Sequence, residues 1–173
     1  MLVGFMGAGK SSVGKKLSEE ICIPFVDSDD EIELAAGMSI SEIFEQFGEA
    51  YFRAGEERVI KRLLSNHPRI IATGGGAFMS TTLRSLIKQK GVSIWLKADF
   101  GTIWERIQGK RTRPLLEVED PKSTLKNLMK ERAKIYKEAD ITVHSRKTGT
   151  HANMVSKLIK LLSADGTLEQ WDG

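Results

Sequence analysis

The run from Gly4 to Ser11 reads GFMGAGKS and matches the pattern G-x-x-x-x-G-K-[ST], which is typical of a phosphate-binding loop. Glycines let such a loop curl so that several backbone N–H groups point at one anion, and the following helix adds the positive end of its dipole. Lys10 is expected to reach the β and γ phosphates and Ser11 to hold Mg²⁺. The predicted nucleotide-binding residues of this loop are Gly7, Ala8, Gly9, Lys10, Ser11 and Ser12.

A dinucleotide-binding fingerprint, G-x-G-x-x-G, competes for the same glycines. Gly7 and Gly9 could supply its first two positions, but Ser12 stands where the third glycine is required. We therefore set a dinucleotide-dependent oxidoreductase aside.

Short apolar runs alternate with amphipathic stretches along the chain, and this alternation indicates the fold class. Because parallel strands need crossover connections, it predicts an α/β fold with a parallel sheet covered by helices on both faces. Only three residues precede Gly4, so we expect the first strand to be short and further residues to lie upstream. Further strands are expected at 24–26, 69–73, 92–97 and 141–143, and helices at 11–21, 30–36, 39–48, 49–64, 81–90, 100–107, 123–138 and 151–162. Ser39 and Glu42 are in capping-box register at the start of the third helix, and Gly48 is expected to end it.

In parallel sheets of this kind, ligands collect beyond the carboxyl ends of the strands. That rule selects the phosphate loop, residues 27–29, residues 74–76 and the loop after Val143. All four places are expected to line a single cleft.

Size and composition fit one domain over residues 1–173, because 40% of the 173 residues are hydrophobic. The polar tail, residues 163–173, is expected to be loosely ordered. A net charge of +3 suits small anions as well as nucleic acid, so charge does not identify the partner. Cys22 is the only cysteine, which excludes an internal disulfide, and we expect it to pack at a helix end.

No signal peptide and no apolar run of membrane length is present. We therefore expect a cytoplasmic protein with neither a membrane nor a nucleic acid as partner. The three histidines, His67, His144 and His151, have no metal-ligand spacing with Cys22 or with one another, so a zinc site is not expected.

Kinases, ATPases and GTPases all use a phosphate loop, so accessory residues must distinguish them. The guanine-binding pattern N/T-K-x-D is absent, since its nearest match, residues 96–99, begins with leucine. The strand at 69–73 ends in three glycines rather than in a magnesium-binding aspartate. Asp27, at the tip of the neighbouring strand, is the expected metal ligand together with Ser11.

The remaining candidates for site residues are arginines, whose guanidinium groups can bind anions. Arg53 is followed by Glu56 one helical turn later, so an ion pair could hold its guanidinium in place. Arg113 lies in a charged loop that fits either a solvated surface or a mobile lid reaching a transferring phosphoryl group. Arg132 fits either a residue of the site or an exposed charge on a helix surface. The spacing of residues alone does not distinguish the two.

Taken together, several motifs resemble those of the shikimate kinase family, in order and in spacing, from Leu2 to about Leu162. They are the phosphate loop, Asp27-Ser28-Asp29, Phe52-Arg53, Gly74-Gly75-Gly76, Arg113-Pro114-Leu115-Leu116, and Glu131-Arg132 through Tyr136.

This resemblance implies transfer of the γ-phosphoryl group of ATP to the 3-hydroxyl of shikimate, on the route to chorismate and the aromatic amino acids. It implies a P-loop kinase of the nucleoside monophosphate kinase type, with a five-stranded parallel sheet in the order 2-3-1-4-5, a mobile lid at about 108–122 and a single subunit. The sequence departs from the family pattern in two places: the segment 149–151 lacks the proline that many members place before the final helix, and the first strand is short.

The resemblance also assigns roles to individual residues. It implies that Ser11 and Asp27 form the magnesium site and that Lys10, Asp29 and Arg113 are catalytic, Asp29 being the candidate base. It implies that the substrate contacts are Asp29, Arg53, Gly74, Gly75, Gly76 and Arg132, the two arginines clamping a carboxylate, and that Arg106 and Arg113 contact the nucleotide.

Two alternatives stay open on the sequence. One is another small kinase of the same architecture, acting on gluconate or on a nucleoside monophosphate. The other is a nucleotide-dependent binding module without turnover.

Overall fold

The computed structural model describes residues 1–65, 67–108, 120–145 and 150–168, and it contains a single five-stranded parallel sheet in the order β2-β3-β1-β4-β5. The expected α/β fold and strand order are confirmed. The strands are β1 (Leu2–Val3), β2 (Phe25–Asp27), β3 (Ile70–Ala72), β4 (Ile94–Ala98) and β5 (Ile141–Ser145). The helices are α1 (Lys10–Ile21), α2 (Ser28–Ala36), α3 (Ile40–Ser65), the short 3₁₀ helix η1 (Ala77–Met79), α4 (Thr81–Lys90), α5 (Phe100–Ile107), α6 (Pro121–Tyr136) and α7 (His151–Ala164).

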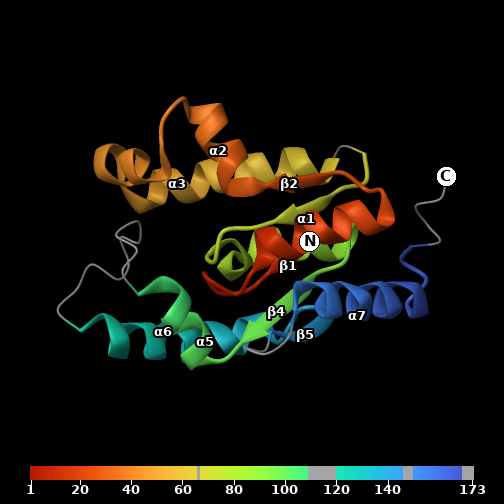
Figure 1. Ribbon diagram of the computed structural model, residues 1–173. Helices are drawn as coiled ribbons and strands as arrows, with labels where there is room; N and C mark the ends of the chain where they lie inside the picture. Colours follow the sequence, from red (N-terminus) through yellow and green to blue (C-terminus); the bar gives the residue numbers. More distant parts are fainter. Residues whose placement is uncertain (66, 109–119, 146–149, 169–173) are drawn as a thin grey trace.

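Helices cover the sheet on both faces (Figure 1). α1 packs along α7, while α3 packs along α4, as right-handed crossovers in this strand order require. β1 is the central strand although it has only two residues, and Leu2 lies between Ala72 of β3 and Ile94 of β4. Both residues of β1 are buried, so the shortest strand lies at the centre of the hydrophobic core.

Helix boundaries follow local capping chemistry. Ser80, Asp99, Asp120 and Thr150 each accept a hydrogen bond from a backbone N–H in the first turn of α4, α5, α6 and α7. Before α3, the Ser39 N–H and hydroxyl both donate to Glu42 (2.7 and 2.6 Å), the predicted capping box.

The expected break at Gly48 is confirmed. Gly48 interrupts α3 with φ 77° and ψ 175°, a conformation that only glycine adopts readily. The break turns the second half of α3, which carries Arg53 and Glu56, relative to the first half.

Two predicted helix starts lie too far along the chain. α2 begins at Ser28 rather than at residue 30, because Asp27 caps it by accepting from the Asp29 N–H at 3.1 Å. α6 begins at Pro121 rather than at residue 123, because Asp120 is its cap and proline is well suited to the first helical position. The segment expected as a lid, 108–122, therefore ends in helix, and its residues 109–119 lie outside the described part of the chain.

Two further expectations concern the ends of helices. The prediction that Cys22 packs at a helix end is wrong, because it is exposed and closes α1 in the left-handed region at φ 54°. Ser163 and Ala164, which the sequence places in a loose tail, form the last turn of α7, and the Thr167 N–H donates to the Leu162 carbonyl at 3.0 Å. Among the described residues, no helix combines the length and apolar character needed to cross a bilayer.

α1 lies close against the sheet at Gly14, where a side chain would meet the ring of Phe25 of β2. A Cβ atom on Gly14 would lie 2.4 Å from Cε2 of Phe25, so Gly14→Ala must displace the ring. Overpacking typically costs about 1–3 kcal/mol, which outweighs the gain of up to about 1 kcal/mol in helix propensity. We expect Gly14→Ala to lower the free energy of unfolding, measured by urea denaturation.

Gly55→Ala in α3 is the matched control, because no atom lies within 4 Å of its Cβ position. It should leave stability unchanged or raise it by up to about 1 kcal/mol. Equal stability changes in the two variants would contradict the close packing of α1 on β2.

Candidate active site

The phosphate loop lies between β1 and α1, as expected, and its backbone turns sharply at two glycines. Gly7 and Gly9 have φ angles of 74° and 94°, and Gly9 immediately precedes the first residue of α1. The Lys10 ammonium is buried and donates to the carbonyls of Gly4 (2.9 Å) and Phe5 (3.0 Å). The other predicted residues of the loop, Ala8, Ser11 and Ser12, lie at the same end of α1, where backbone N–H groups are left over from the first helical turn.

The predicted metal ligands lie side by side. The Ser11 hydroxyl donates to Asp27 Oδ2 at 2.6 Å, although 16 positions separate the two residues. Magnesium typically uses only one or two protein oxygens and completes its shell with water and phosphate oxygens, so this pair fits a magnesium–nucleotide site. No cluster of three or more His, Cys, Asp or Glu side chains that could hold a metal by itself occurs in the described ranges.

The glycine loop, residues 74–76 after β3, lies against charged side chains on both sides. A Cβ on Gly74 would lie 2.8 Å from Asp29 Oδ1 and 3.0 Å from Glu56 Oε1. A Cβ on Gly76 would lie 2.5 Å from Arg53 Nη1. Any side chain at these two positions would therefore displace two carboxylates or a guanidinium.

Arg53 is held by two carboxylates of α3. Its Nη1 lies 2.8 Å from Glu56 Oε2 and its Nη2 lies 3.1 Å from Glu49 Oε1, which confirms the ion pair expected from spacing. Glu56 is 1% exposed, and its Oε1 has no hydrogen-bond partner among the described residues. Burial raises the pKa of Glu56 above its ordinary value, and the Arg53 guanidinium opposes that rise.

Arg132 reaches the same loop from α6, which decides against the alternative of an exposed helix charge. Its Nη1 donates to the Gly75 carbonyl at 3.1 Å, and its guanidinium lies 5.4 Å from the ring centroid of Phe5 in the phosphate loop. With Arg53, it lines a hollow of about 350 Å³ beside Gly76.

Sequence reasoning assigned no individual role to Tyr136, although the structure places it in the site. Its hydroxyl donates to the same Gly75 carbonyl, and its ring lies between those of Trp95 and Phe78, at centroid distances of 5.7 and 6.2 Å. Burial raises the pKa of Tyr136 to about 12, so the phenol keeps its proton for this hydrogen bond at neutral pH. Two signals were available: Tyr136 ends the family-like motif that begins at Glu131, and its spacing of four from Arg132 puts both side chains on one helix face.

Gly75 connects the glycine loop to the phosphate loop. A Cβ on Gly75 would lie 3.3 Å from the backbone nitrogen of Met6 and 3.8 Å from Arg132 Nη1. A ligand held by Arg53, Arg132 and Asp29 would therefore lie next to a phosphate bound by residues 7–12. Three of the four expected places, the phosphate loop, residues 27–29 and residues 74–76, are brought together. The fourth, the loop after Val143, includes residues 146–149, which lie outside the described residues.

Arg106, in the last turn of α5, lies on another side of the phosphate loop. Its Nη1 donates to the Gly7 carbonyl at 2.9 Å. Arg113, the predicted lid residue, lies outside the described residues.

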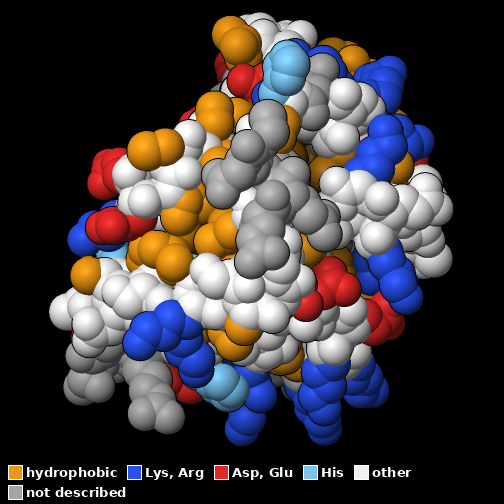
Figure 2. Space-filling model, turned by 90° about the vertical axis from the view of Figure 1, so that its right-hand side faces the viewer, with side chains coloured by type: hydrophobic (Ala, Val, Ile, Leu, Met, Phe, Trp, Pro, Cys, Tyr) orange, Lys and Arg blue, Asp and Glu red, His pale blue; other side chains and the backbone are white. Residues whose placement is uncertain are grey.

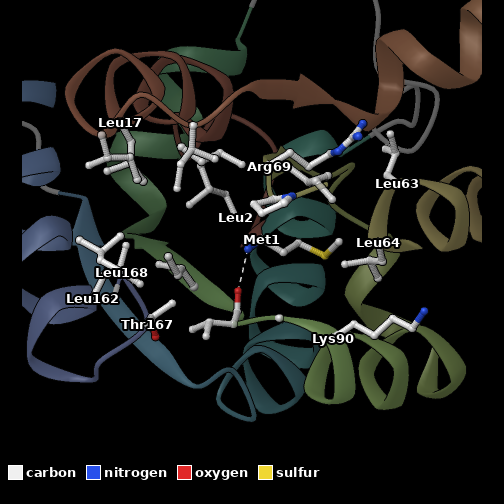
Figure 3. Close-up of a pocket in the computed structure, with 18 of the residues that line it drawn as sticks. Met1, Leu2, Leu17, Leu63, Leu64, Arg69, Lys90, Leu162, Thr167 and Leu168 are labelled. Atoms are coloured by element: carbon white, nitrogen blue, oxygen red, sulfur yellow. Dashed lines mark hydrogen bonds between the residues drawn. The ribbon is translucent and has the colours of Figure 1, made fainter. Parts of the chain in front are cut away.

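Another, more apolar hollow of about 170 Å³ lies at the opposite, amino end of the strands. Figure 2 shows several hydrophobic side chains exposed on this face, mostly to the left of its centre. In Figure 3, Leu2, Leu17, Leu63 and Leu162 surround Met1, whose amine donates to the Val92 carbonyl at 2.6 Å. This hollow has neither the phosphate loop nor the paired arginines, so we place the candidate active site at the carboxyl ends of the strands.

Comparisons with known proteins agree with this geometry. The family model described as shikimate kinase matches residues 6–163. A shikimate kinase of Ruegeria pomeroyi is 49% identical over 163 residues, which cover 94% of this chain and 84% of the relative. A shikimate kinase of Rhizobium leguminosarum bv. trifolii is 53% identical over 146 residues, covering 84% of this chain and 74% of the relative.

Among solved structures, a shikimate kinase from Acinetobacter baumannii in complex with shikimate is 38% identical, with a TM-score of 0.90 over 95% of this chain and 92% of the other. A gluconokinase from Sinorhizobium meliloti is similar in fold alone, at 16% identity and a TM-score of 0.56, over 95% of this chain and 94% of the other.

The hydrogen bond from Tyr136 to Gly75 can be tested without any assumption about function. Tyr136→Phe removes one hydroxyl, and we expect the free energy of unfolding to fall by about 0.5–1.5 kcal/mol, the usual net contribution of such a bond. Urea denaturation measures the change. Tyr51→Phe is the control, because Tyr51 is half exposed and its hydroxyl makes no hydrogen bond to the described residues. Equal losses in both variants would contradict the anchoring of Gly75.

Proposed function

This chain belongs to the shikimate kinase family, and from that premise we propose that it transfers the γ-phosphoryl group of ATP to the 3-hydroxyl of shikimate. The products are shikimate 3-phosphate and ADP, on the route to chorismate and the aromatic amino acids. One observation carries the proposal beyond the family assignment. Gly75 borders both Arg132 and the phosphate loop, so a hydroxy acid and a nucleotide phosphate can meet there.

The acceptor site fits a hydroxylated carboxylic acid. Arg53 and Arg132 offer planar guanidinium groups that can bind a carboxylate through two hydrogen bonds each. Asp29, on the other side of the glycine loop, can accept hydrogen bonds from ring hydroxyls. Glu49 and Glu56 hold Arg53 in place before any ligand arrives, which reduces the entropy lost on binding.

The nucleotide side fits ATP with Mg²⁺. Residues 7–12 supply the phosphate-binding backbone, and Lys10 supplies a cation for the β and γ phosphates. Ser11 and Asp27 would hold the ion, which when bound neutralises phosphate charge. Arg106 contacts the nucleotide side of the loop, and Arg113 is proposed to reach the phosphates from the segment after α5.

Asp29 is the proposed general base. Its carboxylate takes the proton of the 3-hydroxyl while that oxygen forms a bond to the γ phosphorus and the bond between this phosphorus and the β–γ bridging oxygen breaks. Asp29 lies in the first turn of α2, next to the metal ligand Asp27, so the base and the metal site are held by one helix start. Most of the rate enhancement should come from positioning and charge stabilisation, as is usual for phosphoryl transfer.

The remaining parts of the proposal concern the state of the protein. We propose a single subunit in the cytoplasm that acts on small molecules, without a nucleic-acid or membrane partner. Size-exclusion chromatography at micromolar concentration tests the single subunit.

The direct test is ADP release from ATP and Mg²⁺ with and without shikimate, repeated with gluconate and with a nucleoside monophosphate. Shikimate-dependent release supports the proposal. Release that depends on gluconate or on the nucleotide instead would favour another small kinase, and the absence of acceptor-dependent release would favour a binding module without turnover.

Asp29→Asn tests the base. The amide keeps the size of the side chain but has no basicity, and general-base catalysis typically contributes 10²–10⁴-fold, so we expect kcat to fall by about 10²-fold or more. Binding of ATP should not change, because the phosphate loop is intact. Asp30→Asn, one position along α2, is the control and should keep kcat. A near-normal kcat in Asp29→Asn would exclude Asp29 as the base.

Gly76→Ala tests the arginine clamp without altering a charge. The new methyl group would overlap the Arg53 guanidinium, whereas the φ of −103° at Gly76 tolerates alanine. A hydrogen bond to a charged group contributes about 1.5–3 kcal/mol, so KM for shikimate should rise about tenfold or more while KM for ATP stays constant. Gly91→Ala, where the nearest atom lies 4.0 Å from the Cβ position, should change neither value. An equal rise in both KM values would contradict a specific displacement of Arg53.

A further inference from the structure

Arg84 lies near the start of α4 and reaches back to the short helix η1, which directly follows the glycine loop. Its Nη1 donates to the carbonyls of Phe78 and Met79, each at 2.9 Å, and its Nη2 donates to Thr81 Oγ1 at 3.3 Å. The side chain is 17% exposed. Sequence reasoning assigned no role to this arginine, although the structure connects it to the candidate site.

η1 is joined to the glycine loop through its backbone amides. The Ala77 N–H donates to the Gly74 carbonyl at 3.3 Å, and the Met79 N–H donates to the Gly76 carbonyl at 2.9 Å. A three-residue 3₁₀ helix makes few hydrogen bonds of its own, and its last carbonyls have no partner within the helix. Arg84 binds the last two of these carbonyls. The position of the glycine loop therefore depends on η1, and the position of η1 depends on Arg84.

The guanidinium also reaches the end of α6. Arg84 Nε lies 2.9 Å from Glu138 Oε2, and Glu138 follows Tyr136, the last residue of α6, by two positions. Arg132 and Tyr136 of α6 both donate to the Gly75 carbonyl. η1 packs against both α4 and α6. One planar guanidinium therefore connects η1 and α6, the two elements whose groups bind the carbonyls of the glycine loop.

We propose that Arg84 is a positioning residue for the acceptor, which holds η1 and the end of α6 together and through them fixes the glycine loop. The inference rests on the proposed transfer to shikimate. Met79, whose carbonyl Arg84 binds, lines the hollow beside Gly76 together with Arg53. A Cβ on Gly76 would lie 2.5 Å from Arg53 Nη1, so a shift of the loop would also move the surface on which this guanidinium rests.

The contacts of Arg84 require the shape of a guanidinium as well as its charge. Its N–H groups point outward from one plane in fixed directions, so it can bind two carbonyls, a hydroxyl and a carboxylate at the same time. Lysine carries the same charge on a single nitrogen, which cannot span acceptors on both η1 and Glu138. Replacement by lysine therefore separates the effect of geometry from the effect of charge.

Two other roles for Arg84 fit the structure less well. A direct contact with the substrate is not supported, because Arg84 lines a different hollow, with Ser93 and Asp140, from the one that Arg53 and Arg132 line. A surface ion pair alone does not account for it either, because the guanidinium is mostly buried and binds two backbone carbonyls. A purely structural role would affect the nucleotide side and the acceptor side alike, and this provides the test.

The experiment compares the two sides of the site in the wild-type protein, Arg84→Ala, Arg84→Lys and Glu138→Gln. Steady-state kinetics give kcat and KM with shikimate and ATP varied in turn, and isothermal titration calorimetry gives Kd for ADP with Mg²⁺. We expect kcat/KM for shikimate to fall about 10²-fold in Arg84→Ala, the order expected for a displacement of about 1 Å. KM for ATP and Kd for ADP should not change.

The other two variants separate the parts of the contact. Arg84→Lys should recover only part of the loss, because it restores the charge without the fork. Glu138→Gln should lose less than Arg84→Ala, because the hydrogen bonds to η1 remain. Urea denaturation shows that each variant is folded under the assay conditions. If Arg84→Ala does not fold, Arg84→Lys decides, since lower kcat/KM for shikimate at an unchanged Kd for ADP supports the inference and wild-type values overturn it.

Arg62→Ala is the matched control. Arg62 is also a helical arginine paired with a carboxylate, that of Glu31 at 2.6 Å, but it makes no hydrogen bond to a backbone carbonyl of the described residues. Its ion pair joins α3 to α2 rather than η1 to α6. The kinetic constants and Kd for ADP should equal those of the wild type.

Four results would overturn the inference. Arg84→Ala could keep the wild-type kcat/KM for shikimate, or its values for shikimate and for the nucleotide could weaken together, which would indicate a general loss of structure. Arg84→Lys could match the wild type, which would show that charge alone suffices. Glu138→Gln could lose as much as Arg84→Ala, which would place the effect at the ion pair rather than at η1. Failure of the proposed function is a distinct outcome, because the wild-type protein itself would then release no ADP in response to shikimate, and it would overturn both proposals.

Discussion

The close approach of two backbone loops is the constraint on which the site depends. Residues 74–76 follow β3 and residues 4–9 follow β1, and these strands are neighbours in the sheet, so the two loops leave it side by side. Gly75 reaches Met6 of the phosphate loop because it has no side chain, and the glycines on either side leave space for Asp29, Glu56 and Arg53. A side chain at Gly74 or Gly76 would displace Asp29, Glu56 or Arg53, and one at Gly75 would crowd the backbone of Met6. The sheet fixes the direction of both loops. Because glycine has no side chain, residues 74–76 can lie close to the phosphate loop.

The electrostatics of this site is arranged around one buried carboxylate, that of Glu56. Glu56 is almost fully buried, which is unfavourable for a charged group unless it is paired. Its partner Arg53 is also held by Glu49 and remains partly exposed towards the hollow beside Gly76. A carboxylate ligand would therefore meet a guanidinium that is already oriented. The free-energy cost of removing Glu56 from water arises when the protein folds, before the ligand binds. It therefore does not weaken ligand binding directly.

The sequence predicted those parts of the molecule that depend on short-range chemistry. The phosphate loop, the capping box at Ser39 and the break at Gly48 each depend on residues a few positions apart, and all three are present. The start of α2 was placed too late because the cap, Asp27, was taken only as a metal ligand. The exposed Cys22 was misjudged because its left-handed conformation turns the chain at the end of α1. Contacts between residues far apart in the sequence could not be predicted. The hydrogen bond from Tyr136 to Gly75 spans 61 positions, and no local pattern identifies it.

The helices α5 and α6 each bind one of the two loops, α5 the phosphate loop and α6 the glycine loop. Arg106 at the end of α5 binds the Gly7 carbonyl, and Arg132 and Tyr136 of α6 bind the Gly75 carbonyl. α5 and α6 also pack against each other, so a shift between these helices would move the phosphate loop relative to the glycine loop. In-line transfer tolerates little displacement, since an error of about 1 Å in the position of reacting groups can cost about 10²-fold in rate. In the proposed reaction, the packing of α5 on α6 would therefore help to set the distance between the phosphate and the acceptor hydroxyl, although it is remote from the reacting atoms.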